Sequence, residues 1–266
     1  MSDISEMTVD MMGDLPPYGF GALVAARKAG KSHFLSHLIH SVCKKKKYAA
    51  AFVISKTSKA QGSFSFIAPE NHFNPLESEM TTDEFLKKIM KMQRERLDNG
   101  MPSGEVILIL DDIFHDSRSG AGHSSKALSA LASIGRHAKI QCWLCVQRFQ
   151  SISPSLRSQL TDYLCFLPRS TGERSMITEQ FLSREMRSRK ESKQRATEIM
   201  TNVFSEPYRC MWIRPDIQSS LLTDCVFWCK APVDIASWSM TYDIISDGVN
   251  KATTNTSSPL SVLETV

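Results

Sequence analysis

The chain has 266 residues, of which 42% are hydrophobic and 23% charged, with 32 basic against 28 acidic side chains. This length and composition indicate a globular protein that can bury a core, in one α/β domain or in two small ones. The apolar runs fall short of the ~20 residues that span a bilayer, and the acidic N-terminus lacks a signal-peptide pattern. We therefore expect neither a membrane-spanning segment nor secretion.

The formal net charge of +4 by itself neither favours nor excludes a nucleic-acid partner. The 7 cysteines lie mostly in apolar runs, which is typical of buried, reduced thiols. Cys142 and Cys145 have the spacing of half a zinc site, but residues three apart in a strand point to opposite faces of the sheet, which favours core thiols. We expect the protein to work inside a cell or in a particle assembled there.

The pattern along the chain alternates between strands and helices. Residues 1–15 are polar and acidic and are expected to form a flexible arm, whereas residues 246–266 are expected to be a disordered tail. Strands are predicted at Phe20–Ala25, Ala49–Ser55, Val106–Leu110, Ile140–Val146, Tyr163–Leu167, Cys210–Ile213 and Cys225–Cys229. Helices are predicted up to about Val42, from Thr82 to about Asp98, at Lys126–Ile134, within Ser151–Leu160 and along Ile177–Phe204. Residues 56–80 and Ser117–Ser125 are predicted to be loops. Residues 16–245 are predicted to form one α/β domain with a mainly parallel sheet.

The segment Ala25–Ser32 fits the phosphate-binding loop template G-x-x-x-x-G-K-S/T except that Ala25 replaces the first glycine. Such a loop aims backbone N–H groups at phosphate oxygens, and the N-terminus of the next helix adds partial positive charge. Lys31 would reach the β- and γ-phosphates, and the hydroxyl of Ser32 would ligate Mg²⁺. The residues expected around the nucleotide are Ala26, Arg27, Lys28, Ala29, Gly30, Lys31, Ser32 and His33. The alternative is an ordinary turn that contains a glycine.

A second motif is an aliphatic run, Val106–Leu110, that ends in Asp111-Asp112. It has the pattern of a Walker B strand, which delivers a carboxylate to the edge where open α/β sheets bind their ligands. Asp111 would hold Mg²⁺, and Asp112 stands where many ATPases have the glutamate that polarises the attacking water. Aspartate is one methylene shorter than glutamate, so the assignment of Asp112 as the base is weaker than that of Asp111 as the magnesium ligand. The alternative is a strand that merely ends in a turn-forming pair of aspartates.

Gln147 ends the next predicted strand and could sense the γ-phosphate or position water. The order of phosphate loop, acidic strand end and polar strand end predicts a P-loop NTPase of the ASCE, or RecA-like, type, with an added strand beside the phosphate loop. The guanine-specifying N-K-x-D motif of GTPases is missing, because Asn250–Thr253 does not fit it.

Over roughly residues 18–232 the chain resembles the genome-packaging ATPases of large eukaryotic DNA viruses and related mobile elements, within the FtsK/HerA group of translocases. The resemblance is carried by Ala26–Ser32, Leu108–Asp112, Gly135-Arg136-His137, Val146-Gln147, Ser153–Arg157, Asp162-Tyr163 and Tyr208–Ile213. The departures are Ala25 for a glycine and Asp112 for the second acid of the usual Asp-Glu pair.

The resemblance implies an ATPase that uses ATP and Mg²⁺, forms a homo-oligomeric ring and contacts the backbone of double-stranded DNA without reading its sequence. It implies capsid or portal-vertex proteins as partners, and work in the infected cell at sites of virion assembly. Arg136 matches the arginine finger, which reaches the nucleotide of a neighbouring subunit. Arg157 is a second candidate, with a structural ion pair to Asp162 or a backbone contact as its alternative.

Two weaker signals have structural alternatives. His33, His37 and His40 share one face of the first predicted helix, and an exposed face is favoured over a metal site. The basic stretch Arg184–Arg195 is a candidate for DNA phosphates, but it is interleaved with acidic residues, so a solvated helix is an equal alternative.

We therefore predict a motor ATPase that drives double-stranded DNA into a preformed capsid. One alternative is an assembly or scaffolding factor that binds ATP and hydrolyses little of it. Another is a small-molecule phosphotransferase, for which the sequence offers neither an acceptor pocket nor an arginine-bearing lid.

Overall fold

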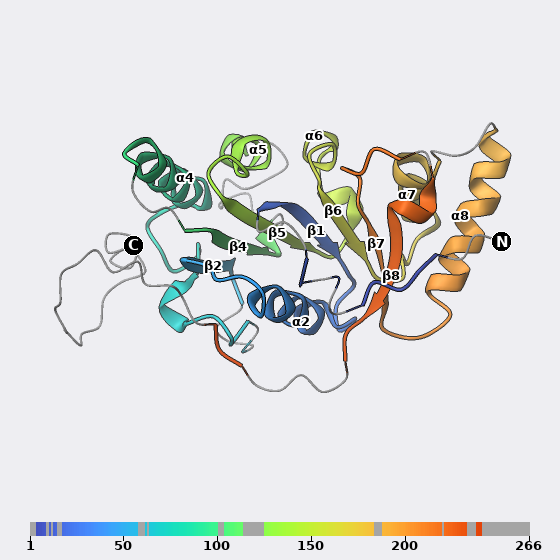
Figure 1. Ribbon diagram of the computed structural model, residues 1–266, viewed down its shortest axis with the longest axis horizontal. Helices are drawn as coiled ribbons and strands as arrows, with labels where there is room; N and C mark the ends of the chain where they lie inside the picture. The colour runs from blue at the N-terminus through green and yellow to red at the C-terminus, as the bar shows by residue number, and fades with distance from the viewer. Residues whose placement is uncertain are drawn as a thin grey trace.

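An eight-stranded sheet runs through the part of the chain that the computed structural model describes, in the order β3-β2-β4-β5-β1-β6-β7-β8 (Figure 1). The described residues are 4–8, 11, 13–14, 18–57, 62, 64–100, 104–113, 125–183, 188–219, 221–232 and 238–240. The strands are β1 Gly19–Val24, β2 Ala50–Ser55, β3 His72–Phe73, β4 Val106–Asp111, β5 Ile140–Val146, β6 Asp162–Cys165, β7 Arg209–Ile213 and β8 Val226–Lys230.

The sheet is mainly parallel, as predicted. In sheet order, β3, β2, β4, β5, β1 and β6 pair in parallel with one another. Strand β7 is antiparallel to both β6 and β8. All residues of β4 and β5 are buried, which explains their uninterrupted apolar sequences, because helices cover both faces of a parallel sheet. Strand β5 lies between the acidic strand β4 and the phosphate-loop strand β1, so it is the added strand that the sequence predicts.

The helices form a layer on each side of the sheet. Helices α4, α5 and α6 cover one face and α2 covers the other, while α7 and α8 lie toward the β7–β8 end (Figure 1). The helices are α2 Lys31–Cys43, α4 Thr82–Asp98, α5 Lys126–Ile134, α6 Pro154–Arg157, α7 Thr171–Ile177 and α8 Arg189–Val203. Shorter turns are the 3₁₀ segments η1 Pro69–Asn71, η3 Phe149–Ser151 and η5 Leu222–Asp224, and the π-helical segment η4 Thr178–Leu182. Each face of the sheet has its own apolar core.

The predicted helix Ile177–Phe204 is wrong in its extent, because the structure divides it. Helix α7 already begins at Thr171, after Ser170 caps it, and continues through η4. The side chain of Ser188 accepts a hydrogen bond from the backbone N–H of Glu191, so a new helix, α8, begins there. Residues 184–187, which include the first arginines of the basic stretch, lie outside the described residues.

The prediction that Thr82 caps helix α4 is wrong by one residue, because Thr81 is the cap and α4 begins at Thr82. The Thr81 hydroxyl accepts from the Glu84 N–H at 3.2 Å, and the Glu84 carboxylate accepts from the Thr81 N–H at 2.8 Å. This reciprocal pair satisfies two N–H groups that the helix start leaves without partners. Residues 56–80, predicted to be a loop, contain η1 and the short edge strand β3.

Part of the predicted N-terminal arm packs against β8. The Met7 N–H donates to the Trp228 carbonyl at 2.7 Å, the Trp228 N–H donates to the Ser5 carbonyl at 3.1 Å, and Met7 is buried. The arm is therefore held at these residues. The predicted loop residues 117–124 and the predicted tail 246–266 lie outside the described residues.

The cysteine prediction is confirmed, since Cys142 and Cys145 are buried thiols in the cores on opposite faces of the sheet. The prediction of an exposed histidine face is wrong for His37, which is only 6% exposed. Residues 238–240 cover this side of α2: Trp238 stacks on His40 at 4.6 Å and donates to the Ser36 hydroxyl at 3.2 Å. Among the described residues, no helix is long and apolar enough to cross a membrane.

Candidate functional site

The three predicted motifs meet at the carboxyl edge of the sheet. Val24, the last residue of β1, is in register with Val146 at the end of β5, and Asp111 at the end of β4 is in register with Cys145. The residues that follow these strand ends are the phosphate loop, Asp112 and Gln147. Parallel strands therefore bring motifs more than 100 residues apart in the chain to one place.

The phosphate loop is fastened at both ends by backbone hydrogen bonds. The Ala25 N–H donates to the Val146 carbonyl at 3.0 Å, and the Phe34 N–H donates to the Gly30 carbonyl at 2.8 Å. Gly30 is the N-cap of α2 at φ 90° and has no side chain that could accept from the first N–H groups of the helix. These N–H groups are left for a ligand, and the helix dipole favours an anionic one.

Lys31 joins the phosphate loop to the acidic strand end. Its Nζ lies 2.8 Å from Oδ1 of Asp111 and 3.5 Å from Oδ1 of Asp112. The side chains of Lys31 and Asp111 are largely buried, with 13% and 9% exposed, whereas that of Asp112 is 34% exposed. The two residues on which the sequence-based hypothesis depends thus share one site.

Gln147 and Ser55 extend this cluster along the edge. Gln147 Nε2 donates to Oδ2 of Asp112 at 2.8 Å, and the Ser55 hydroxyl donates to Oδ2 of Asp111 at 3.5 Å. Asp112 has φ 51°, in the left-handed region that aspartate and asparagine tolerate better than most residues. This turn directs the Asp112 carboxylate toward both Lys31 and Gln147.

Burial controls the protonation of the cluster. Burial raises the pKa of the Asp111 carboxyl, against the opposing effect of Lys31. Burial alone would lower the pKa of Lys31, but the neighbouring acidic groups Cys145, Asp111 and Asp112 more than reverse this, so that its pKa is raised. Lys31 therefore stays a cation, and a single ammonium faces two carboxylates. A further cation would fit the unbalanced charge.

The carboxylate of Asp111 and the hydroxyl of Ser32 are the hard oxygen donors that Mg²⁺ prefers. Among the described residues, no cluster of three or more His, Cys, Asp or Glu side chains could hold a metal by itself. In nucleotide enzymes one or two protein ligands to magnesium are usually completed by substrate phosphates and water.

A cavity of about 460 Å³ adjoins the phosphate loop on the face of the sheet that carries α7. Its rim includes three arginines, Arg27, Arg148 and Arg169, together with Gln147. The carboxylate of Glu173 lies in its wall and accepts from the Phe149 N–H at 2.8 Å. The amide that contacts Asp112 therefore also borders a basic cavity.

The structure does not bring Arg136 to this site within one chain. Arg136 lies in the exposed turn between α5 and β5, which precedes the amino end of β5. A strand of this length separates the two edges of the sheet by roughly 20 Å. Arg136 therefore does not reach the phosphate loop of its own chain.

Arg157 has structural partners, which differ from those considered in the sequence. Its guanidinium lies 4.8 Å from the centre of the Phe149 ring, and its Nη1 donates to Gln180 Oε1 at 3.3 Å. Asp162 instead accepts a hydrogen bond from Trp212 Nε1 at 3.0 Å, and its Oδ1 lies 3.7 Å from Arg214 Nε. The proposed Arg157–Asp162 pair is thus replaced by a stack on an aromatic ring.

Sequence reasoning missed three residues near the site. The hydroxyl of Ser55 contacts Asp111. The carbonyl oxygen of Pro232 lies 2.7 Å from Nε2 of His33. Tyr208 lies beside Gly30. Ser55 ends a predicted strand, so its position at the edge was available from the pattern. Tyr208 directly precedes β7 and Pro232 follows β8, two strands whose antiparallel course the sequence does not reveal.

The fold and the site define a P-loop NTPase of the ASCE type, with the added strand between the phosphate-loop strand and the acidic strand. The model of the poxvirus A32 protein family matches residues 20–233, which is most of the chain. The chain belongs to this family.

One viral relative is similar to the chain in sequence, and solved structures are similar to it in fold. Protein 015R of Frog virus 3 (isolate Goorha), an uncharacterized protein, is 24% identical over 204 residues, which are 77% of this chain and 59% of that protein. The chain thus spans less than two thirds of that relative's length.

Among solved structures, the genome packaging NTPase B204 from Sulfolobus turreted icosahedral virus 2, in complex with AMPPCP, has a TM-score of 0.55 at 16% identity and covers 82% of this chain and 100% of its own. The cytoplasmic domain of the type VII secretion ATPase EccC from Thermomonospora curvata has a TM-score of 0.53 at 14% identity and covers 83% of this chain and 27% of its own. At these identities the likeness shows a shared fold.

Proposed function

We propose that the protein is an ATP-hydrolysing translocase that packages viral double-stranded DNA into a preformed capsid. The observation that carries the proposal is the contact of Lys31, at the N-terminus of α2, with Asp111 and Asp112 at the end of β4. This contact supports a site in which Lys31 would bind phosphate and the adjacent Asp111 would bind magnesium. Membership of the poxvirus A32 protein family and the fold shared with B204 support the same function.

ATP is held by its phosphates in this proposal. The N–H groups of Ala26–His33 and the ammonium of Lys31 bind phosphate oxygens, and a bound Mg²⁺, ligated by Ser32 and Asp111, would neutralise charge on the transferring phosphoryl group. In the structure Lys31 is paired with Asp111 at 2.8 Å. Nucleotide binding therefore exchanges an internal ion pair for contacts to phosphate.

Hydrolysis needs an oriented water and a charge-stabilising group. Asp112 is the proposed base, and Gln147 orients it through the 2.8 Å hydrogen bond. Arg136, at the opposite edge of the sheet, supplies the finger to a neighbouring subunit in a head-to-tail ring. A single subunit then lacks one catalytic group, so hydrolysis depends on assembly.

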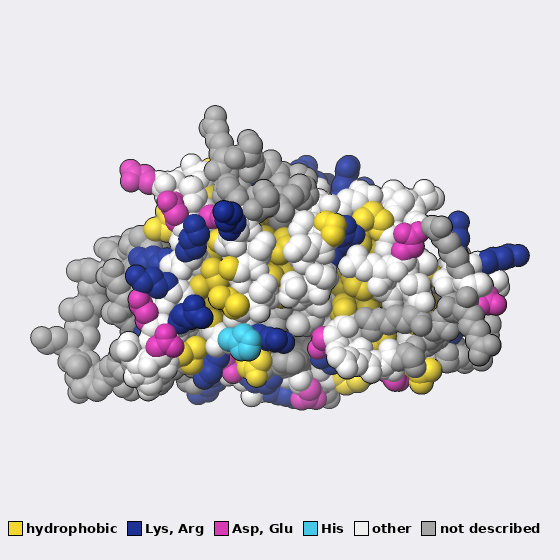
Figure 2. Space-filling view, turned by 90° about the horizontal axis from the view of Figure 1, so that it is seen from above, with side chains coloured by type: hydrophobic (Ala, Val, Ile, Leu, Met, Phe, Trp, Pro, Cys, Tyr) yellow, Lys and Arg dark blue, Asp and Glu magenta, His cyan; other side chains and the backbone are white. Residues whose placement is uncertain are grey.

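DNA contact is proposed for the exposed basic side chains of α8, which include Lys190 and Lys193. These residues line a groove of about 1270 Å³ between α7 and α8, with Arg174 on the other side. On the face that carries α4, α5 and α6, basic side chains of the described residues are interspersed with acidic ones (Figure 2). Contacts of this kind would read the phosphate backbone and not the bases.

The proposal also includes capsid or portal-vertex proteins as partners and virion-assembly sites of the infected cell as the place of action. The second candidate function is an ATP-binding assembly or scaffolding factor. The exposed Arg136, which has no access to the nucleotide of its own chain, favours a hydrolysing ring over that candidate.

The test is ATP turnover measured against protein concentration, with and without duplex DNA. A motor shows turnover per subunit that rises as the ring assembles and rises again with DNA. A scaffolding factor binds ATP but shows neither increase, and that outcome would reject the motor.

A further inference from the structure

Tyr208 is an exposed aromatic residue held at the entrance of the phosphate loop. Its side chain is 63% exposed, and its φ of 63° lies in the left-handed region that disfavours a bulky residue. A Cβ built on Gly30 would lie 3.7 Å from Cδ1 of Tyr208 and, among the described residues, would meet no other atom within 4 Å beyond its own chain neighbours. The ring therefore faces the open side of the loop.

The topology explains how Tyr208 reaches this position. Strand β7 runs antiparallel to β6, with Met211 opposite Cys165, and Cys165 is in register with Val24 of β1. Tyr208 precedes Met211 by three residues, so it projects roughly 10 Å beyond the strand end at which the phosphate loop begins. Only a strand that enters the sheet from the carboxyl edge can place a residue there.

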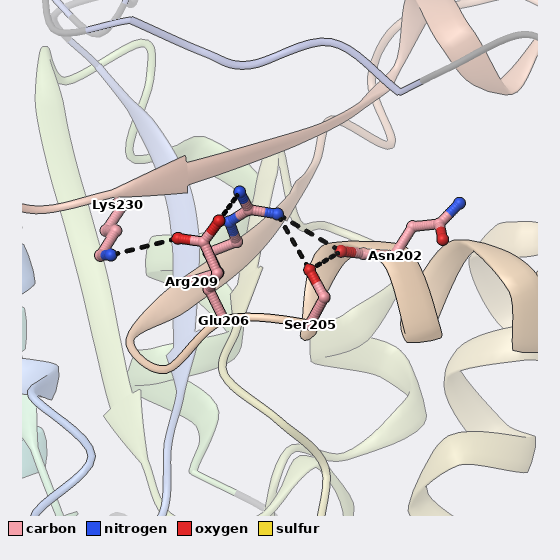
Figure 3. Close-up of polar contacts among 5 residues, drawn as sticks. All are labelled: Asn202, Ser205, Glu206, Arg209 and Lys230. Atoms are coloured by element: carbon pink, nitrogen blue, oxygen red, sulfur yellow. Dashed lines mark hydrogen bonds and ion pairs between the residues drawn. The ribbon is translucent and has the colours of Figure 1, made fainter.

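The turn before β7 is fixed by a network centred on Arg209 (Figure 3). The Arg209 guanidinium lies 4.1 Å from the centre of the Trp228 ring, and its Nη1 donates to the Asn202 carbonyl and to the Ser205 hydroxyl. Glu206 pairs with Arg209 and also with Lys230 at 3.3 Å. These contacts join α8, β7 and β8, so the backbone on each side of Tyr208 is anchored and its left-handed conformation is maintained.

The end of β8 approaches the same turn of α2. The Pro232 carbonyl lies 2.7 Å from Nε2 of His33, and Lys230 is opposite Arg209 in the ladder. A base that extends from phosphates bound at this turn toward the start of β7 and the end of β8 would reach Tyr208. Tyr208 is the aromatic surface at that position.

We propose that Tyr208 is the base-stacking residue of the nucleotide site, against whose ring the aromatic base of a bound nucleoside triphosphate packs. The inference rests on the proposed function in one respect, since the phosphate loop must hold a nucleotide. Stacking on an aromatic ring accepts any base, so Tyr208 adds affinity without choosing strongly among bases. An anchored backbone lowers the entropy lost when the base binds.

The experiment compares the full-length protein with three variants, Tyr208→Gly, Tyr208→Phe and Lys31→Ala, for binding of two probes in the presence of Mg²⁺. One probe is ATP and the other is inorganic tripolyphosphate, which has the phosphates but no base. Glycine tolerates the left-handed φ of position 208, so Tyr208→Gly removes the ring without straining the backbone. Melting temperatures verify that each variant folds.

We expect Tyr208→Gly to raise the Kd for ATP about tenfold, because stacking of one base on an aromatic ring has this magnitude, and to leave the Kd for tripolyphosphate unchanged. Tyr208→Phe should have the wild-type Kd values for both ATP and tripolyphosphate, because it keeps an aromatic ring. Quenching of etheno-ATP fluorescence on binding should be lost in Tyr208→Gly and kept in Tyr208→Phe.

The inference is overturned if Tyr208→Gly binds ATP as the wild type does. It is also overturned if its Kd values for ATP and tripolyphosphate rise together, since the ring would then support the loop or an interface instead of a base. If the wild type binds neither probe, the phosphate-loop assignment fails as well. If Lys31→Ala loses both probes while Tyr208→Gly matches the wild type, only the role of Tyr208 fails.

Discussion

Gln147 donates a hydrogen bond from Nε2 to Oδ2 of Asp112 at 2.8 Å, while Lys31 approaches the other carboxylate oxygen at 3.5 Å. Asp112 is thereby held from two sides and aimed at the space above the phosphate loop. This fixed orientation supports the proposed role of Asp112 as the base that polarises water.

The first prediction concerns Asp112→Asn. Asparagine has the same shape, tolerates the φ of 51° and can still accept from Gln147, so ATP binding should persist. Turnover should fall about 100-fold or more, because general base catalysis contributes this much. Binding and turnover are measured on the same preparation, with Asp98→Asn on the exposed end of α4 as the control. Unchanged turnover would exclude Asp112 as the base.

The second prediction concerns Lys31→Ala. Charge-assisted hydrogen bonds from the ammonium to phosphate are lost, and each contributes about 1.5–3 kcal/mol, so the Kd for ATP should rise about 100-fold. Titration calorimetry measures the change, and Lys91→Ala, at an exposed position on α4, is the control that should bind as the wild type does. Tight ATP binding by Lys31→Ala would refute the phosphate-loop assignment.

The third prediction concerns Arg136→Ala. Because Arg136 lies in the turn before the amino end of β5, its loss should leave ATP binding intact and reduce turnover about 10³-fold. Mixing this variant with Asp112→Asn, which keeps the finger, should restore part of the turnover. The neighbouring exposed His137→Ala is the control. A mixture as inactive as its components would remove the support for a finger in trans.

The fourth prediction concerns pH. Burial lowers the pKa of His37 from 6.5 to about 4, with smaller contributions from His40, Lys44 and His33. Between pH 6.5 and pH 4 the unfolded chain therefore binds a proton that the folded chain rejects, so His37 makes the free energy of unfolding fall as the pH falls. The loss should be about 1–3 kcal/mol by pH 4. Urea unfolding at several pH values checks this.

In that experiment His37→Gln should flatten the pH dependence. An equal slope for wild type and His37→Gln across this range would show that other groups cause the loss.

The fifth prediction concerns Gly21, in the middle of β1. A Cβ at this position would overlap the ring of Trp143 on the neighbouring strand β5. Gly21→Ala should therefore destabilise the fold by about 1–3 kcal/mol, the usual cost of overpacking a core. Gly172→Ala in α7, whose Cβ would have ordinary contact with Gln150, is the matched control. A Gly21→Ala protein with wild-type melting temperature would contradict the packing.

The sequence by itself determined the central architecture and the principal cluster of the site. Aliphatic runs such as Val106–Leu110 predict buried parallel strands, because only those bury both faces. Since parallel strands share a carboxyl edge, the motifs at Lys31, Asp111 and Gln147 had to meet there. Local chemistry and one topological rule were sufficient for these inferences.

Only the tertiary structure decided the surroundings of this cluster. The stack of Trp238 on His40 and the position of Tyr208 beside Gly30 are contacts between segments far apart in the chain. Periodicity within one segment shows which face is apolar, but not which distant segment covers the other face. The antiparallel turn of β7 is a further example, since an apolar strand has the same sequence pattern in either direction.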